Sequence, residues 1–265
     1  MKLTDIKNDY RYLILGASGT GKTTLCGTLA EIMPTVIVTA DLAGLATLKK
    51  MKILPTTEII FIESWENIWD YYKDVARLSE NYLGIAIDDF SAIQETSRHR
   101  LERKPRTTQE ERMGKTEVKL AIRQELMLGD RRLRLTDWGG LWVAMENFLY
   151  EVLKLPYKIK LVTVLEEKAI NPRTSEEAIY PALQGSLRTT ILARFGFVGE
   201  TFVTYSTERK PLYCLHCCSH PRVESKTRFG EGRTWVNPTI QKLINHIKGG
   251  DNAETELERR IGIGV

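Results

Sequence analysis

One stretch near the amino terminus constrains this chain more than any other feature, and it runs Gly16-Ala17-Ser18-Gly19-Thr20-Gly21-Lys22-Thr23. It matches the phosphate-binding pattern G-x-x-x-x-G-K-[ST] at every fixed position. An apolar run over residues 11–15 predicts a buried strand before it, and residues 24–33 predict a helix after it. A chance glycine-rich turn is disfavoured, because strand, loop and helix stand in the order that the motif requires.

The residue types of this stretch fit a phosphate ligand. Its three glycines let the backbone curl so that successive N–H groups point at phosphate oxygens, and the following helix adds the positive end of its dipole. Lys22 can reach the β- and γ-phosphates, and the Thr23 hydroxyl can ligate Mg²⁺. With ATP and Mg²⁺ as the expected cofactors, the expected binding residues are Gly16, Ala17, Ser18, Gly19, Thr20, Gly21, Lys22, Thr23 and Thr24.

A second signal is a pair of carboxylates at the end of a short apolar run. Residues 83–87 predict a buried strand, and Asp88 and Asp89 follow it directly. Downstream of a phosphate loop, the first acid after such a strand is expected to hold Mg²⁺ together with the Thr23 hydroxyl. Asp88 is therefore the predicted metal-side residue, whereas Asp89 is either a second acid or a cap for the turn that follows.

Two further acids follow predicted strands. Asp41 comes after residues 34–40, and Glu166 comes after residues 159–165. Because the carboxyl ends of parallel strands face the ligand crevice, both acids could act near the γ-phosphate. Asp41 would orient or deprotonate the attacking water, or it would only cap a helix over residues 42–50. Glu166 would sense the γ-phosphate, or it would end a solvated strand. The expected catalytic residues are Lys22, Asp41, Asp88 and Glu166.

Composition bounds the class of protein. The chain has 265 residues, of which 42% are hydrophobic and 27% charged, and this fits one globular α/β domain with an insertion. We expect that domain over residues 1–248 and a flexible tail over residues 249–265. No stretch approaches the ~18 apolar residues of a membrane span, and the first residues lack the apolar core of a signal peptide. The protein is therefore predicted to be cytoplasmic, without membrane contact.

The four cysteines do not predict a disulfide framework. Three of them share one run with two histidines, Cys214-Leu-His216-Cys217-Cys218-Ser-His220. Zinc is disfavoured, because a structural site takes its ligands from two separated segments, whereas these residues lie on one predicted strand whose alternate side chains face opposite ways. A strand of small buried residues is the preferred interpretation.

A basic segment interrupts the pattern of strands and helices. Residues 98–134 hold twelve Arg or Lys against six Asp or Glu, in a chain whose formal net charge is +4. We expect two helical pieces around a flexible link, as a basic insertion over residues 98–136. It would contact a nucleic-acid backbone, or it would be a solvated helical face with interleaved acids. The candidate contacts are Arg98, Arg100, Arg103, Lys104, Arg106, Arg131, Arg132 and Arg134.

The rest of the chain contains further helical, loop and strand signals. Residues 136–140 contain two adjacent glycines and predict a turn, and residues 141–153 predict an amphipathic helix. Residues 169–178 have the composition of a mobile loop. Residues 195–205 and 211–217 predict an antiparallel pair of strands.

The order of these motifs resembles the core of the RecA-like P-loop ATPases, and within that group the compact phage ATPases of single-strand annealing and recombination. Besides the phosphate loop and Asp41, the resemblance rests on residues 85–93, 137–139, 161–165, 181–185 and 194–195, within a span from 10 to 247. It implies an α/β fold with a mostly parallel sheet flanked by helices, to which the residue patterns above add a helical basic insertion and a C-terminal β-hairpin. It also implies single-stranded DNA as a partner, and a homo-oligomer in the form of a ring or a filament.

The resemblance also assigns residues by position. Lys22 and Thr23 would bind phosphate and Mg²⁺, and residues 167–178 would face DNA. Asp41 stands where the family usually has a glutamate, and Glu166 stands where it has His or Gln, so the chain departs from the family pattern at both positions. The residues that would reach a neighbouring subunit's nucleotide, where a positive charge stabilises the transferring phosphoryl group, are Arg188, Arg194, Lys226 and Arg228.

These observations favour a Mg²⁺-dependent ATPase that acts on single-stranded DNA in phage-type recombination or strand annealing. Two other classes remain open. One is a P-loop kinase for a small molecule, in which the basic segment would be a lid. The other is a nucleotide-driven helicase loader or DNA-packaging motor. Oligomeric state with ATP would separate the kinase from the RecA-like hypothesis.

Overall fold

The computed structural model describes residues 10–63, 68–103, 135–170, 175–185, 187–217, 225–228 and 232–247, without the side chains of 99–103 and 135–141. Its centre is a single sheet with the strand order β10-β8-β7-β1-β5-β4-β2-β3, while β6 pairs with β5 and β9 pairs with β7. The strands are β1 (Tyr10–Gly16), β2 (Thr35–Thr39), β3 (Glu58–Phe61), β4 (Gly84–Ile87), β5 (Ile159–Ile170), β6 (Glu177–Pro181), β7 (Phe197–Tyr205), β8 (Pro211–Cys217), β9 (Lys226–Thr227) and β10 (Arg233–Val236).

The sheet is mostly parallel. The strands from β3 to β7 in the sheet order run in one direction, whereas β6, β8, β9 and β10 run antiparallel to their neighbours. The strands β7 and β8 form the predicted C-terminal hairpin, which joins residues 197–205 to residues 211–217. The predicted fold class, an α/β fold with helices around a mostly parallel sheet, is confirmed.

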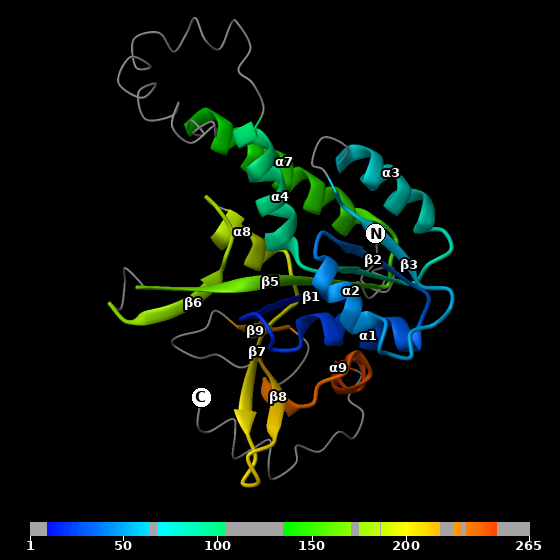
Figure 1. The fold of residues 1–265 in the computed structure, drawn as a ribbon, viewed down its shortest axis with the longest axis vertical. Coiled ribbons are helices and arrows are strands. Elements are labelled where there is room, and N and C mark those ends of the chain that lie inside the picture. Colours follow the sequence, from blue (N-terminus) through cyan, green and yellow to red (C-terminus); the bar gives the residue numbers. More distant parts are fainter. Residues whose placement is uncertain are drawn as a thin grey trace, which may run out of the picture.

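Helices cover both faces of the sheet (Figure 1). The helices are α1 (Lys22–Ile32), α2 (Leu42–Leu48), α3 (Ile68–Leu78), α4 (Phe90–Arg103), α7 (Leu135–Lys154), α8 (Leu187–Ala193) and α9 (Ile240–Ile247). One hydrophobic cluster joins the sheet to α3, α4, α7 and α8. A second cluster joins the other face to α1, α2 and α9. The strand β1 contributes side chains to both clusters, because alternate side chains of a strand point to opposite faces.

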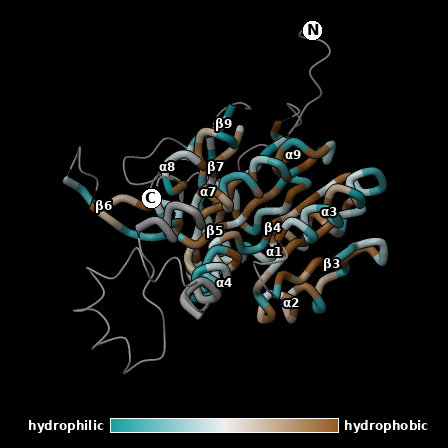
Figure 2. Tube along the Cα trace, turned by 90° about the horizontal axis from the view of Figure 1, so that it is seen from above, coloured by the Kyte–Doolittle hydropathy of each residue, from teal (hydrophilic) through white to brown (hydrophobic). Residues whose placement is uncertain are grey.

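The side chains of β1 alternate between the two hydrophobic clusters. Leu13 and Leu15 belong to the first cluster, and Tyr12 and Ile14 belong to the second. All four side chains are fully buried, and the central strands are correspondingly hydrophobic in Figure 2. A strand buried on both faces between two parallel neighbours is a rigid base, so the loop that leaves it at Gly16 starts from a fixed point.

Two sequence expectations were wrong. Residues 136–140, predicted as a turn, lie within α7; this helix buries Met145, Phe148 and Leu149 in the core. Burial of that face outweighs two glycines that cost about 1 kcal/mol each in a helix. Residues 169–178, predicted as a loop, are partly strand, because β5 continues to Ile170 and pairs with β6.

The basic insertion is described only at its two ends. The helix α4 ends at Arg103 and α7 begins at Leu135, and residues 104–134 lie outside the described residues, as does the predicted tail over 249–265. Among the helices that the structure describes, none has the length and apolar character needed to cross a membrane.

Candidate functional site

The phosphate-loop glycines are required by backbone geometry and by space. Gly19 and Gly21 have φ angles of +79° and +95°, which side-chain-bearing residues rarely adopt. At Gly16 the constraint is space, since an added Cβ would lie 2.1 Å from Thr201 Oγ1. The loop therefore needs its three glycines, the two that the motif fixes, Gly16 and Gly21, and also Gly19 at a variable position of the motif.

Lys22 begins α1 and is 7% exposed. Its ammonium Nζ donates to the carbonyl oxygens of Gly16 and Ala17, at 2.8 Å each. Burial lowers the pKa of Lys22, and the carboxylates of Asp89, Asp88 and Glu166 oppose that shift. The structure thus places one cation inside the loop, near Asp88 and Asp89, which follow β4. The third acid, Glu166, was predicted to follow a strand but lies within β5, because pairing with β6 extends that strand to Ile170.

Asp88 follows β4 and is 2% exposed. Thr163 Oγ1 donates to Asp88 Oδ1 at 2.7 Å, and the Thr23 hydroxyl also hydrogen-bonds to this carboxylate. Burial raises the pKa of Asp88, while the two hydroxyls and the Lys22 charge oppose the shift. Thr23 and Asp88 therefore offer adjacent hard oxygen atoms, the ligand type that Mg²⁺ prefers.

The oxygen atoms of Thr23 and Asp88 fit a magnesium ion that is shared with phosphate. Within the described residues, no group of three or more His, Cys, Asp or Glu is arranged around a metal position. Mg²⁺ in nucleotide sites is commonly bound by one or two protein groups, with phosphate oxygens and water completing its coordination. Two protein oxygens beside a phosphate loop meet that requirement.

Asp41 and Asp89 both cap helices. Asp41 Oδ1 accepts from the Ala43 N–H at 2.8 Å, at the start of α2. Asp89 Oδ1 accepts from the Ser91 and Ala92 N–H groups at 2.6 Å and 3.2 Å, at the start of α4. Burial raises the pKa of Asp89 to about 6, although the nearby Lys22 charge lowers it. Capping does not remove either acid from the site, because both line its cavity.

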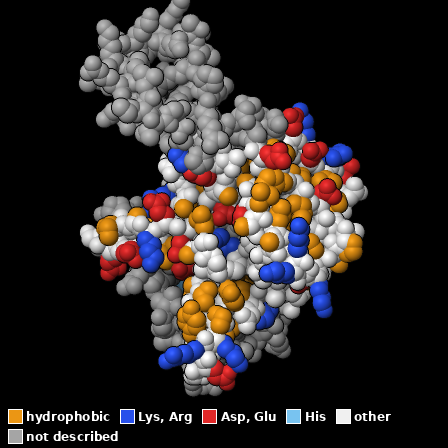
Figure 3. All heavy atoms as spheres, in the orientation of Figure 1, with side chains coloured by type: hydrophobic (Ala, Val, Ile, Leu, Met, Phe, Trp, Pro, Cys, Tyr) orange, Lys and Arg blue, Asp and Glu red, His pale blue; other side chains and the backbone are white. Residues whose placement is uncertain are grey.

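The cavity beside the phosphate loop has a volume of about 540 Å³, within the range of small-molecule sites. Blue and red side chains adjoin near the centre of the face shown in Figure 3. Glu166 is not among the residues that line the cavity, although its charge acts on Lys22. The lining residues are Ser18, Gly19, Gly21, Lys22, Thr23, Thr24, Asp41, Ala43, Gly44, Thr47, Asp88, Asp89, Ala92, Leu165 and Tyr213.

Sequence reasoning missed Thr201, which supports the loop from β7. Its Oγ1 donates to the Leu15 carbonyl oxygen at 3.0 Å and lies 2.8 Å from Thr20 Oγ1. The Thr20 hydroxyl also bonds the Ala17 carbonyl oxygen at 2.8 Å. No local pattern marks Thr201, because the parallel pairing of β7 with β1 creates the contact across 186 residues of sequence.

A second missed residue is Glu200, which is 7% exposed on β7. Burial and the neighbouring Glu166 carboxylate raise the pKa of Glu200 to about 7, while the Lys168 charge lowers it. Two acids from strands on either side of β1 are therefore close enough to repel one another. The register explains this. Leu15 of β1 pairs with Glu200 on one side and with Val164 on the other, and Glu166 comes two residues after Val164, on the same face of β5.

Two of the four residues predicted to reach a neighbouring subunit line a second cavity, of about 550 Å³. Arg194 pairs with Glu146 at 2.5 Å, and its guanidinium lies 5.0 Å from the Tyr150 ring centroid. The residues around this cavity are Arg11, Glu146, Tyr150, Leu153, Thr190, Ala193, Arg194 and Arg228. Arg11 precedes Gly16 by five residues of strand, or about 16 Å. The second cavity thus lies near the amino-terminal end of β1, whereas the phosphate loop leaves the carboxyl end of that strand.

The other two predicted residues differ in their surroundings. Lys226 is in β9, where burial and the Arg228 charge lower its pKa. Arg188 lies apart from the second cavity, with its guanidinium 4.3 Å from the Tyr180 ring centroid and 3.7 Å from Glu167. Arg188 of α8 therefore contacts both strands of the β5–β6 pair, through Glu167 and Tyr180.

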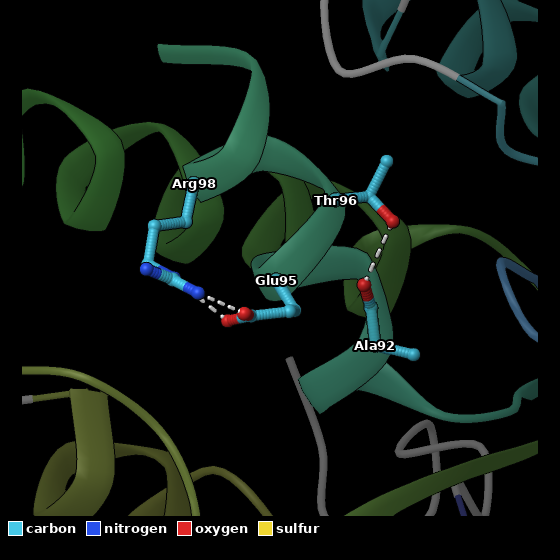
Figure 4. A network of polar contacts seen from close by, with 4 residues as sticks. All are labelled: Ala92, Glu95, Thr96 and Arg98. Atoms are coloured by element: carbon cyan, nitrogen blue, oxygen red, sulfur yellow. Dashed lines mark hydrogen bonds and ion pairs between the residues drawn. The ribbon is translucent and has the colours of Figure 1, made fainter. Parts of the chain in front are cut away.

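Arg98 is the only predicted nucleic-acid contact whose side chain is described. It pairs with Glu95 one turn earlier in α4, next to a bond from Thr96 Oγ1 to the Ala92 carbonyl oxygen at 3.0 Å (Figure 4). Arg100 and Arg103 lie in the last turns of α4. The remaining candidates, Lys104, Arg106, Arg131, Arg132 and Arg134, lie outside the described residues.

The Cys-His run is a buried strand over its described part. Cys214, His216 and Cys217 are buried in β8. His216 Nδ1 lies 2.9 Å from Thr234 Oγ1 of β10, and Cys217 Sγ donates to the Val198 carbonyl oxygen at 3.2 Å. These contacts belong to the sheet. Cys218 and His220 lie outside the described residues.

The fold and the site together define a P-loop α/β protein with a cavity beside its phosphate loop. The chain belongs to the AAA domain family, which matches residues 8–229. A comparison with curated proteins found no match.

Two solved structures are similar to this chain. The flagellar accessory protein FlaH from Methanocaldococcus jannaschii shares 15% identity over 87% of this chain and 86% of its own, with a TM-score of 0.43. The RadB recombinase shares 11% identity over 86% of each chain, with a TM-score of 0.45.

The raised pKa of Glu200 predicts a pH dependence of stability. A carboxyl group whose pKa is higher in the folded than in the unfolded state keeps its proton in the folded state, so stability falls as pH rises between the two values. For Glu200 these values are 4.5 and about 7. Relative to Glu200→Gln, the wild-type unfolding free energy should fall across this range by on the order of 1–3 kcal/mol.

Urea denaturation of both proteins at pH 5 and pH 8 measures this change. The exposed Glu58→Gln is the control for the loss of a carboxylate. A wild-type-minus-Glu200→Gln difference that stays constant between the two pH values would contradict the assignment.

Proposed function

We propose that this protein binds ATP with Mg²⁺ at the phosphate loop, hydrolyses it, and acts as an oligomer on single-stranded DNA in phage-type recombination or strand annealing. The observation that carries the nucleotide part is the arrangement of Lys22, Thr23 and Asp88. One cation, one hydroxyl and one carboxylate meet beside a glycine loop, in a cavity of about 540 Å³.

The chemistry follows from these groups. Lys22 can exchange its bonds to two loop carbonyls for bonds to phosphate oxygens, and charge-assisted bonds are the stronger ones. Thr23 and Asp88 would hold Mg²⁺, which neutralises charge on the phosphates when bound. Asp41 lines the same cavity and would orient the attacking water, while Glu166, which lies within electrostatic reach of Lys22, would sense the γ-phosphate.

The first prediction tests the nucleotide site. Lys22→Ala should weaken ATP binding by about a hundredfold or more, because a buried cation and its bonds to phosphate are lost. Isothermal titration calorimetry with Mg-ATP measures this affinity. Lys73→Ala, which removes an exposed lysine paired with Asp70, is the control and should bind as the wild type does. Unchanged ATP affinity in Lys22→Ala would refute the phosphate-loop assignment.

The DNA part rests on the basic segment of the sequence, residues 98–134. Replacing Arg131, Arg132 and Arg134 together by Gln should lower the affinity for a poly-dT oligonucleotide at low salt. The slope of log affinity against log salt should become shallower by about 0.7 for each lost phosphate contact. Filter binding with and without ATP measures both quantities.

A matched control separates local contact from net charge in this experiment. Lys49, Lys50 and Lys52 are exposed residues near the end of α2, and replacing all three by Gln removes the same charge. Equal loss in both triple variants would favour a general charge effect over contact by the basic segment. No wild-type DNA binding in either nucleotide state would end the DNA proposal.

The oligomer part is supported by the position of Arg194 and Arg228. Both line the second cavity, at the end of β1 away from the chain's own phosphate loop. They would therefore contact a neighbouring subunit's nucleotide. Arg188 and Lys226 remain further candidates for the same role. A cation that approaches from a second subunit stabilises the charge that develops on the transferring phosphoryl group.

Mixing two inactive variants tests this shared site. Lys22→Ala and Arg228→Ala should each lose most ATPase activity, whereas an equal mixture that reassembles at random should regain about one quarter of the wild-type rate. That fraction is the share of interfaces with both residues intact. A mixture no more active than the mean of its components would refute action between subunits, and light scattering with and without ATP would show whether the subunits assemble.

A further inference from the structure

Tyr213 stands at the phosphate-loop cavity without belonging to any motif of the sequence. It lies on β8 and is 41% exposed. Its ring atom Cδ1 lies 3.3 Å from the position that a Cβ on Gly21 would take, so the ring rests directly against the loop. Of the described residues that line this cavity, Tyr213 is the only aromatic one. Hydrophobic side chains gather over the β7–β8 hairpin in Figure 3.

The backbone at Tyr213 is fixed by the sheet. Tyr213 pairs with Val203 of β7, and its carbonyl oxygen accepts from the Asn237 N–H at 2.7 Å. The strand β7 in turn pairs with β1, which carries the phosphate loop. The strand that carries the ring and the strand that leads into the loop therefore belong to one hydrogen-bonded sheet, so a ligand that contacts both would meet two groups held on a common base.

Two parts of the cavity lining differ in chemistry. The phosphate loop offers N–H groups, the Lys22 ammonium and the Thr23 hydroxyl, all suited to phosphate. Beside Gly21, Tyr213 offers a flat, partly exposed ring, and aromatic rings stack on nucleobases without sequence-specific hydrogen bonds. A nucleoside triphosphate has the same polarity, with charged phosphates at one end and a flat base at the other.

From this match, we infer that the purine base of the bound nucleotide stacks on Tyr213. This inference rests on the proposed function, and it names the residue that recognises the base. Loss of one base–aromatic stack by alanine substitution typically weakens binding about fivefold to a hundredfold. Tripolyphosphate has no base, so its affinity should depend on the loop and be indifferent to Tyr213.

The experiment compares ATP with tripolyphosphate, both with Mg²⁺, by isothermal titration calorimetry. Tyr213→Ala should lose at least fivefold in ATP affinity and bind tripolyphosphate as the wild type does, whereas Tyr213→Phe should retain both affinities. The matched control is Tyr205→Ala on the same hairpin, since Tyr205 is 67% exposed and pairs with Pro211 away from the cavity. It should change neither affinity.

Two results would overturn the inference. One is unchanged ATP affinity in Tyr213→Ala. The other is an equal loss of ATP and tripolyphosphate, which would mean that the ring supports the loop instead of the base. Failure of the proposed function gives a different result, because a wild-type protein that binds neither ligand has no nucleotide site at all.

Discussion

The parallel pairing of β1 with β5 on one side and β7 on the other is the constraint on which the site depends. It places Gly16 beside Leu165 and Thr201, so that the loop leaves the sheet between two fixed strands. The second neighbour then supports the loop through the Thr201 hydroxyl. A loop anchored in this way is partly ordered before any ligand arrives, which reduces the entropy lost on binding.

Charge balance around Lys22 is the second principle of the site. A buried ammonium and buried carboxylates stabilise each other, whereas either alone would bear the full cost of desolvation. The Thr23 and Thr163 hydroxyls add neutral donors to Asp88, so the acid has bonds that do not depend on the lysine. Lys22 can therefore turn toward phosphate without leaving that carboxylate unpaired. Glu200 differs from Asp88, because burial and the like charge of the neighbouring Glu166 both raise the pKa of Glu200.

The sequence was sufficient where a signal is local. The phosphate loop, the acid after β4 and the β7–β8 hairpin could each be predicted from short patterns of glycine, apolar and charged residues. It was insufficient where two segments decide together. The glycines within residues 136–140 indicate a turn by themselves, but the buried face of α7 keeps them helical. The β5–β6 ribbon likewise depends on cross-strand pairing that its loop-like composition conceals.

The sequence by itself determined which chemical groups meet at the proposed phosphate site: a glycine loop, Lys22, Thr23 and an acid at the end of a buried strand. Only the tertiary structure decided what stands around them. Thr201, Glu200 and Tyr213 come from strands far along the chain and carry no motif, because sheet register is a property of paired strands. The structure also placed Arg194 and Arg228 near Arg11, at the end of β1 away from the phosphate loop. That position follows from how the strands and α8 pack and not from the local sequence.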